Sequence, residues 1–154
     1  TWLHGEAARY PELVGAVLAG STKRRDPAAP HPPSSDVDLF IYVDAEVPSE
    51  ILEPHGRFAP RKLAFRGVVL EPSFHEARRI ADPEAVLGDM HLAPVFTDPR
   101  ILLDPYGRLE ALAAAVKKTS WSGWLVTEEG GGPKPGDTAA LGPDREYIRK
   151  LFGA

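Results

Sequence analysis

Residues 14 to 44 read VGAVLAGSTKRRDPAAPHPPSSDVDLFIYVD, and the interpretation of the whole chain starts from this segment. It begins with an apolar run, Val14–Ala19, that is too short and too uniformly apolar for an amphipathic surface helix. This run therefore predicts a buried strand. The segment ends with a second predicted strand, Asp36–Val43, whose first residues include two carboxylates. Gly20-Ser21 and a proline-rich loop separate the two strands.

The two acids of the second strand are predicted to lie side by side. Side chains alternate between the two faces of a β-strand, so Asp36 and Asp38 share one face. The other face carries four apolar residues, Val37, Leu39, Ile41 and Val43. We expect this apolar face to be buried and the acids to stand on the face away from the core. Carboxylates this close repel each other unless a cation neutralises them, and a divalent metal ion is the usual one.

Length and composition limit the class of protein. A chain of 154 residues with 43% hydrophobic and 26% charged residues fits one globular domain. No apolar run approaches the roughly 18 residues that span a bilayer, so we expect no membrane partner. Cysteine is absent, which fits a reducing cytoplasm, and we expect the protein there. A net charge of −4 argues against bulk binding of nucleic acid, which requires a basic surface.

Hydrophobic periodicity predicts the remaining elements. Further strands are expected over Leu63–Phe74 and Arg100–Leu103, and helices over Gly5–Leu13, His75–Leu92 and Arg108–Lys118. The last helix is the most regular, with Leu109, Leu112, Ala113 and Val116 at helical spacing. The predicted fold class is α/β (α+β), a small mixed β-sheet flanked by helices. It occupies residues 1–120.

Smaller features refine these elements. Ser21–Arg25 predicts one helical turn, and Pro11 and Asp82-Pro83 are expected to interrupt their helices. Gly67 predicts a bulge within the third strand, and Pro72 indicates a sheet edge or a strand end. Residues 121–154 form a Gly/Pro-rich tail with linker composition and a possible short helix over Pro143–Phe152.

The order of these features resembles the signature of the DNA polymerase β-like nucleotidyltransferases. An apolar strand leads into Gly20-Ser21, and Asp36-Val37-Asp38 opens the next strand; the similarity is strongest over residues 14 to 44. It implies a fold like the polymerase β palm, with the catalytic domain over residues 1–120. It also implies transfer of a nucleoside monophosphate from a nucleoside triphosphate to a hydroxyl. Asp36 and Asp38 would hold two Mg²⁺ ions.

The same resemblance assigns further site residues. The family places a third acid on a neighbouring strand, and Glu71 suits that role, completing the second metal site and acting as base toward the acceptor hydroxyl. Gly20 and Ser21 would cradle the β- and γ-phosphates. The glycine that the family often has a few positions later is missing here. Lys23, or one of the two arginines after it, could bind the triphosphate instead; a solvated basic turn is the alternative.

A second phosphate-binding motif does not fit. Gly15–Thr22 comes close to the P-loop pattern, but Ser21 stands where that pattern requires lysine. Its intervening residues are apolar and suit a buried strand. We therefore reject the P-loop interpretation.

The sequence thus predicts a metal-dependent nucleotidyltransferase that uses a nucleoside triphosphate, with ATP the expected donor. The expected acceptor is a small molecule or a protein. Antibiotic-modifying members of the superfamily add a helical domain that helps to bind the acceptor, and residues 121–154 are too short to supply one. We therefore expect either a homodimer that builds the acceptor site or a helical domain missing from this chain. The chain begins with Thr and has a single Met, so we also expect that part of the native chain is missing.

Two alternatives remain open. One is a non-catalytic, antitoxin-like minimal nucleotidyltransferase that keeps the fold and binds a protein partner. The other is a metal-binding α/β module with no nucleotide role, which metal binding indifferent to added triphosphate would favour.

Overall fold

The structure is a computed structural model that describes residues 2–7, 9–26, 28–32, 35–48, 55–59 and 61–119. The predicted tail over residues 121–154, its helix at Pro143–Phe152 and the domain boundary at residue 120 lie outside these residues. Those predictions stay untested.

The centre of the described chain is a five-stranded sheet in the order β3-β4-β2-β1-β5. The strands are β1 (Leu13–Leu18), β2 (Asp36–Val43), β3 (Leu63–Phe65), β4 (Val68–Glu76) and β5 (Arg100–Leu103). β2 runs parallel to β4 and antiparallel to β1, while the two outer strands are antiparallel to their neighbours. The sheet is therefore mixed, as predicted, and β2 and β5 have the predicted bounds.

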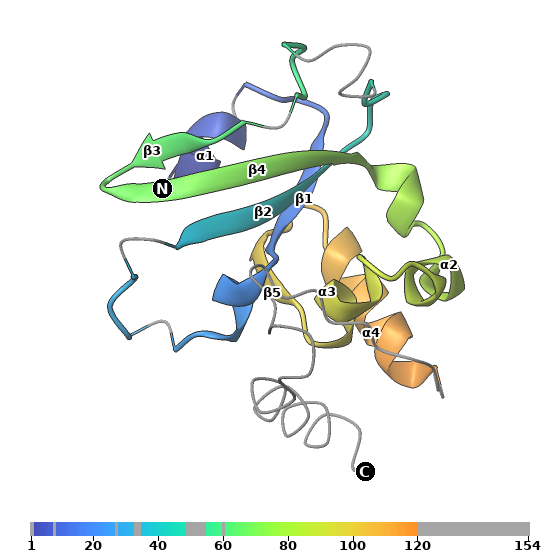
Figure 1. Cartoon of the computed structure of the whole chain (residues 1–154). Helices are drawn as coiled ribbons and strands as arrows, with labels where there is room; N and C mark the ends of the chain where they lie inside the picture. Colours follow the sequence, from blue (N-terminus) through green and yellow to red (C-terminus); the bar gives the residue numbers. More distant parts are fainter. Residues whose placement is uncertain are drawn as a thin grey trace, which may run out of the picture. The chain divides into compact units, whose positions relative to one another are not determined.

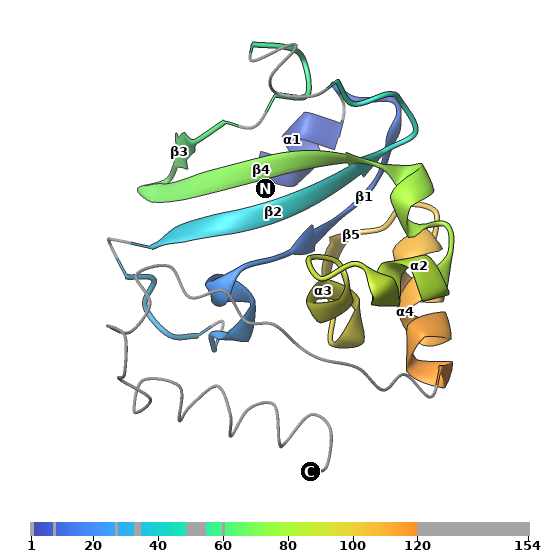
Figure 2. The same ribbon diagram turned by 45° about the vertical axis from the view of Figure 1, so that its right-hand side comes forward.

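Helices cover both faces of this sheet. On one face lie α2 (Pro83–Gly88), α3 (Ala93–Thr97) and α4 (Arg108–Lys118), which stay close together in both ribbon views (Figures 1 and 2). Side chains of α1 (Trp2–Ala7) pack against the core on the other face. Two cores result, one under each layer. In the described residues, no helix has the length and the apolar character needed to cross a membrane.

Helix α4 fits the sheet because its predicted apolar stripe is correct. Leu109, Leu112, Ala113 and Val116 are all buried. Gly15 of β1 allows the close approach, since a Cβ atom added there would lie 2.5 Å from Leu109 Cδ1 and 2.7 Å from the carbonyl oxygen of Leu103. The helix therefore packs directly on the backbone of β1.

The single strand predicted over Leu63–Phe74 is wrong, because the segment folds back on itself as the hairpin β3–β4. Phe65 pairs with Val68, so the connection has only Arg66 and Gly67. Their φ angles are 52° and 81°. Two consecutive residues with positive φ are typical of a type I′ turn, whose twist matches that of the flanking strands. Gly67 thus makes a turn and not a bulge.

Pro72 lies in the middle of β4 and is fully buried. The pairing of β4 with β3 ends at Leu70, whereas the pairing with β2 continues to Glu76. Among the described residues, Pro72 therefore has a strand partner on one side only. From Pro72 onward β4 is therefore a local edge of the sheet, as predicted. On the open side the missing N–H of proline interrupts no hydrogen bonds between strands.

The helix predicted over His75–Leu92 is also corrected. His75 and Glu76 belong to β4, because they pair with the last two residues of β2. A 3₁₀ helix, η2 (Ala77–Ile80), follows. The predicted break near Asp82-Pro83 is present: the Asp82 side chain accepts a hydrogen bond from the backbone N–H of Glu84, 3.0 Å away, and begins α2.

Two further helices differ from prediction. α3 was not predicted; it begins at Ala93 and carries proline in its first turn. The helix predicted over Gly5–Leu13 ends at Ala7, and Leu13 already starts β1. Pro11 lies in the intervening turn, where its missing N–H does no harm.

Candidate metal centre

The three predicted acids come together on one face of the sheet. Asp36 and Asp38 open β2, and the parallel register sets Glu71 of β4 beside Asp38. One carboxylate oxygen from each residue lies within 4.8 Å of the others, and all three side chains are half-buried. We call Asp36, Asp38 and Glu71 the acid cluster. Strand alternation predicted the common face of Asp36 and Asp38, and the parallel register of β2 and β4 adds Glu71 to it.

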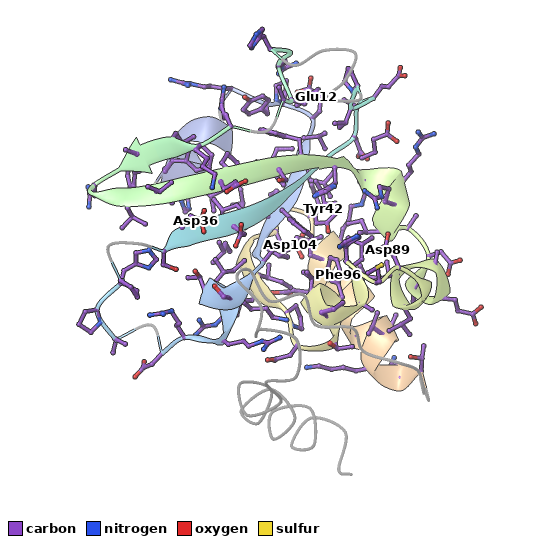
Figure 3. The ribbon with its side chains drawn as sticks, viewed as in Figure 1. Glu12, Asp36, Tyr42, Asp89, Phe96 and Asp104 are labelled. Atoms are coloured by element: carbon purple, nitrogen blue, oxygen red, sulfur yellow. The ribbon has the colours of Figure 1, made fainter. Side chains whose placement is uncertain are left out.

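The expectation that these acids stand away from the core needs a correction. Their face of β2 and β4 continues with Phe40, Tyr42 and His75, which we call the aromatic cluster. Tyr42 is fully buried and belongs to the core under α2, α3 and α4. Figure 3 labels Asp36 and Tyr42 toward opposite ends of β2. The acid cluster therefore occupies the part of a core-bearing face that the helices leave uncovered.

Gly20 packs directly against the acid cluster. Its φ of 59° and ψ of −164° are accessible essentially to glycine alone. A Cβ atom added at Gly20 would lie 1.8 Å from Asp38 Oδ2. The backbone N–H of Ala19 donates to the Asp38 carbonyl oxygen at 2.9 Å, which holds the two chain segments together. Gly20 was predicted to approach phosphate; the close approach found here is to a carboxylate.

The 3₁₀ helix η1 (Ser21–Arg24) starts directly after Gly20 and matches the predicted helical turn. Ser21 is exposed. The hydroxyl of Thr22 donates to the Asp36 carbonyl oxygen at 2.8 Å, which ties η1 to the first residue of β2. The segment predicted to bind phosphate is thus fixed next to the acid cluster.

Lys23 lies elsewhere than its predicted role suggests. Its Nζ donates to the carbonyl oxygens of Pro94 at 2.6 Å and Val95 at 3.2 Å, both in α3. Burial lowers the pKa of Lys23 to about 8, and the nearby charge of Asp98 opposes this shift. The ammonium is therefore engaged with α3. Its contact with a triphosphate stays a prediction.

The residue missed by sequence reasoning is Lys62. Its Nζ lies 2.8 Å from Asp36 Oδ2 and 2.7 Å from Glu71 Oε2. Lys62 immediately precedes β3, and the pairing of Leu63 with Leu70 brings it next to Glu71. No local pattern in the sequence reveals this contact, because it depends on the register of the β3–β4 hairpin.

Lys62 neutralises the acid cluster unevenly. Its hydrogen bond is the main cause that lowers the pKa of Asp36, and the same contacts raise the pKa of Lys62. The pKa of Asp38 is raised instead, first by burial and then by the negative charges of Asp36 and Glu71. The positive charge of Lys62 opposes this rise only in part. A site of three carboxylates with a charge deficit fits a hard divalent cation such as Mg²⁺.

A separate open pocket of about 480 Å³ lies at the opposite ends of β2 and β4. It is lined by Val43–Glu46 and Glu76–Arg78. No member of the acid cluster lines it, so the pocket and the candidate metal centre are different places. Three of its charged side chains have partners: Arg78 pairs with Glu76, and Asp44 pairs with Arg108 at 2.6 Å.

Comparisons with known proteins bear on the fold. No family model matches the chain, and no curated protein sequence matches it. A solved structure does match, that of a nucleotidyltransferase-like protein from Exiguobacterium sibiricum 255-15, with a TM-score of 0.50 and 13% sequence identity. The match covers 75% of this chain and 36% of the other, so this chain spans about a third of that protein's length. At this identity the likeness establishes the fold alone, and it confirms the predicted nucleotidyltransferase-like fold.

Proposed function

We propose that the chain is a metal-dependent nucleotidyltransferase that transfers a nucleoside monophosphate from a nucleoside triphosphate, with ATP the expected donor, to a hydroxyl group. One observation carries this proposal: three carboxylates lie within 4.8 Å of one another on the uncovered end of the β2–β4 face. The nucleotidyltransferase-like fold supports it. So does Gly20-Ser21, which lies directly beside these carboxylates.

The acid cluster is the proposed metal site. Asp36 and Asp38 would bind both Mg²⁺ ions, and Glu71 would complete the second site. Carboxylate oxygens are the protein ligands that Mg²⁺ prefers. When bound, the two ions would stabilise the charge on the entering and leaving oxygens during phosphoryl transfer.

The chain's own residues would bind the donor and move the proton. The backbone amides at Gly20 and Ser21 would hold the β- and γ-phosphates, since amides at the start of a helical turn favour anions. Glu71 would take the proton of the acceptor hydroxyl. The acceptor oxygen then bonds to the α-phosphorus while the bond from that phosphorus to the bridging oxygen breaks. Pyrophosphate leaves, and the acceptor keeps the nucleoside monophosphate.

The acceptor side of the reaction is proposed only by class. A small molecule or a protein hydroxyl is the expected acceptor, and the protein would act in the cytoplasm. A second copy of the chain, or a helical domain beyond this chain, would complete the acceptor site.

A second candidate function is supported by Lys23. Two carbonyl oxygens of α3 hold its ammonium, so a triphosphate would have to compete with α3 for this cation. This favours a non-catalytic, antitoxin-like member of the fold that binds a protein partner. Such a protein would not bind nucleotide.

Calorimetry of ATP binding with and without Mg²⁺ distinguishes the two. We expect ATP to bind in a Mg²⁺-dependent manner, and we expect Asp36→Asn/Asp38→Asn to lose this binding. The matched control is Glu84→Gln/Glu110→Gln, which removes two exposed carboxylates from α2 and α4 and should bind like the wild type. If the wild type shows no ATP binding while a protein partner co-purifies with it, the second candidate replaces the first.

A further inference from the structure

The proposed reaction does not explain Lys62. Its ammonium group bridges two members of the acid cluster, Asp36 and Glu71, at 2.8 and 2.7 Å. Asp38 is packed against Gly20 instead. One positive charge thus faces three carboxylates and contacts two of them, and the Lys62 side chain is 62% exposed.

These contacts are easy to exchange. Lys62 precedes β3 and is not itself part of a strand. Its charge sits on a flexible stem, and ion pairs between exposed side chains hold weakly. The ammonium can therefore leave the carboxylates by rotations of its own side chain, with no change in the sheet.

A divalent cation in the acid cluster and the ammonium of Lys62 exclude each other. The cation would take oxygens from the same carboxylates that the ammonium contacts. Because the ligand oxygens lie within 4.8 Å of one another, both positive charges would be only a few ångströms apart. Repulsion at such a separation is strong compared with an exposed ion pair.

We propose that Lys62 is an exchangeable counter-ion that leaves the acid cluster when Mg²⁺ binds and then contacts the phosphates of the nucleoside triphosphate. This inference rests on the proposed function and adds a donor-binding residue to it. The metal repels the ammonium, while the triphosphate bound beside the acid cluster attracts it. The exchange also releases the Glu71 carboxylate from its ion pair with Lys62, so that it can take the proton of the acceptor hydroxyl.

The test is to measure Mn²⁺ and MgATP affinities separately in Lys62→Met, which keeps the length of the stem and removes the charge. Mn²⁺ alone is titrated by electron paramagnetic resonance, and MgATP by calorimetry. We expect Lys62→Met to bind Mn²⁺ about three- to tenfold tighter than the wild type, the range for the loss of two exposed ion pairs. We expect MgATP to bind at least about threefold more weakly. A merely structural lysine would not produce opposite changes.

The matched control is Arg66→Met in the turn of the same hairpin. It removes the same charge, and the contact it deletes is the one between the guanidinium and the Phe65 ring. Both affinities should stay at the wild-type values. Lys62→Gln serves as a second variant if Lys62→Met unfolds, as monitored by urea denaturation.

The outcomes distinguish a failure of the role proposed for Lys62 from a failure of the proposed function. Unchanged Mn²⁺ affinity in Lys62→Met overturns the counter-ion role, while Mg²⁺-dependent ATP binding by the wild type leaves the proposed function standing. Equal gains in Mn²⁺ and MgATP affinity overturn the contact with phosphate. If neither the wild type nor Lys62→Met binds Mn²⁺ or MgATP, the proposed function is overturned together with the inference.

Discussion

The acid cluster and the aromatic cluster are consecutive parts of one surface, the same face of the paired strands β2 and β4. Asp38 stands beside Glu71 in the register, and two positions farther along the strands Phe40 stands beside Ser73. After two more positions Tyr42 stands beside His75. The first part is half-buried and charged. In the second part Tyr42 is fully buried under helices, and the half-buried rings of Phe40 and His75 pack together with their centroids 4.5 Å apart.

This difference shows that covering helices, and not the strands, divide the surface. Both parts have the same backbone pairing, and the side chains change from carboxylates to aromatic rings where the core under α2, α3 and α4 begins. Close packing around the buried Tyr42 ring makes the covered part rigid, since close-packed interiors have little freedom. The acids are therefore held on a firm base while their oxygens stay accessible. A metal site requires both properties.

The largest effect is expected from Gly20→Ala. The added Cβ would lie 1.8 Å from Asp38 Oδ2 and 2.7 Å from its Cγ, so the Asp38 carboxylate must shift from its position in the acid cluster. The backbone angles at Gly20 are also unfavourable for alanine, and this strain should lower the free energy of unfolding by about 1–3 kcal/mol. We expect MgATP affinity to fall by about 100-fold or more, measured by calorimetry alongside urea unfolding.

Gly67→Ala is the control for that experiment. Gly67 also has a positive φ, 81°, but nothing lies within 4 Å of an added Cβ. Its substitution should cost about 1 kcal/mol of stability and leave MgATP affinity unchanged. Equal losses of affinity in the two variants would contradict the packing of Gly20 on the metal centre.

The next largest effect is a loss of stability at low pH, which we expect from His75 of the aromatic cluster. Burial lowers the pKa of His75 to about 4 from the ordinary value of 6.5. Its Nδ1 faces Arg79 Nη1 at 3.3 Å, and arginine only donates, so the neutral ring accepts at Nδ1 and carries its proton on Nε2. Between pH 6.5 and 4 the unfolded chain binds a proton that the folded chain does not. Stability therefore falls as pH falls through this window, by up to about 3 kcal/mol.

Urea unfolding at pH 7 and pH 4.5 measures this loss. The variant His75→Gln should lose less stability on acidification than the wild type, whereas His91→Gln, which changes an exposed histidine, should behave like the wild type. Equal acid sensitivity in all three proteins would show that the His75 ring is not shielded from water strongly enough to lower its pKa.

The smallest effect is expected from Tyr42→Phe. The Tyr42 hydroxyl is buried and has no hydrogen-bond partner in the described part of the chain. Removing it should leave stability unchanged or raise it by up to about 1 kcal/mol, because a buried hydroxyl without a partner is unfavourable. Tyr10→Phe should have the opposite sign, since Arg61 Nη2 donates to the Tyr10 hydroxyl at 3.3 Å. Thermal unfolding of both variants shows whether their changes in stability have opposite signs.

The sequence predicted what depends on local periodicity. Alternation along β2 put Asp36 and Asp38 on one face, and the helical spacing of α4 identified its buried stripe. Glu71 followed from a resemblance to a family, and the parallel register then set it beside Asp38. The alternation along β2 and the buried stripe of α4 each depend on only a few neighbouring residues, which is why the sequence alone could predict them.

What could not be predicted depends on contacts between distant segments. The turn at Arg66-Gly67 was read as the interior of a strand, because arginine rarely adopts a positive φ. Lys62 joins the acid cluster only once that hairpin has formed. The second core on the acid-bearing face was missed for the same reason: its covering helices come from residues 83–118.

Anomalous diffraction from crystals grown with Mn²⁺ and a non-hydrolysable ATP analogue would locate the metal itself. We predict anomalous density among the carboxylates of Asp36, Asp38 and Glu71, with the triphosphate next to Gly20-Ser21 and the Lys62 ammonium moved away from the acids. Crystals saturated with Mn²⁺ that show no density there, with the ammonium still bridging Asp36 and Glu71, would contradict the assignment of the acid cluster as a metal centre.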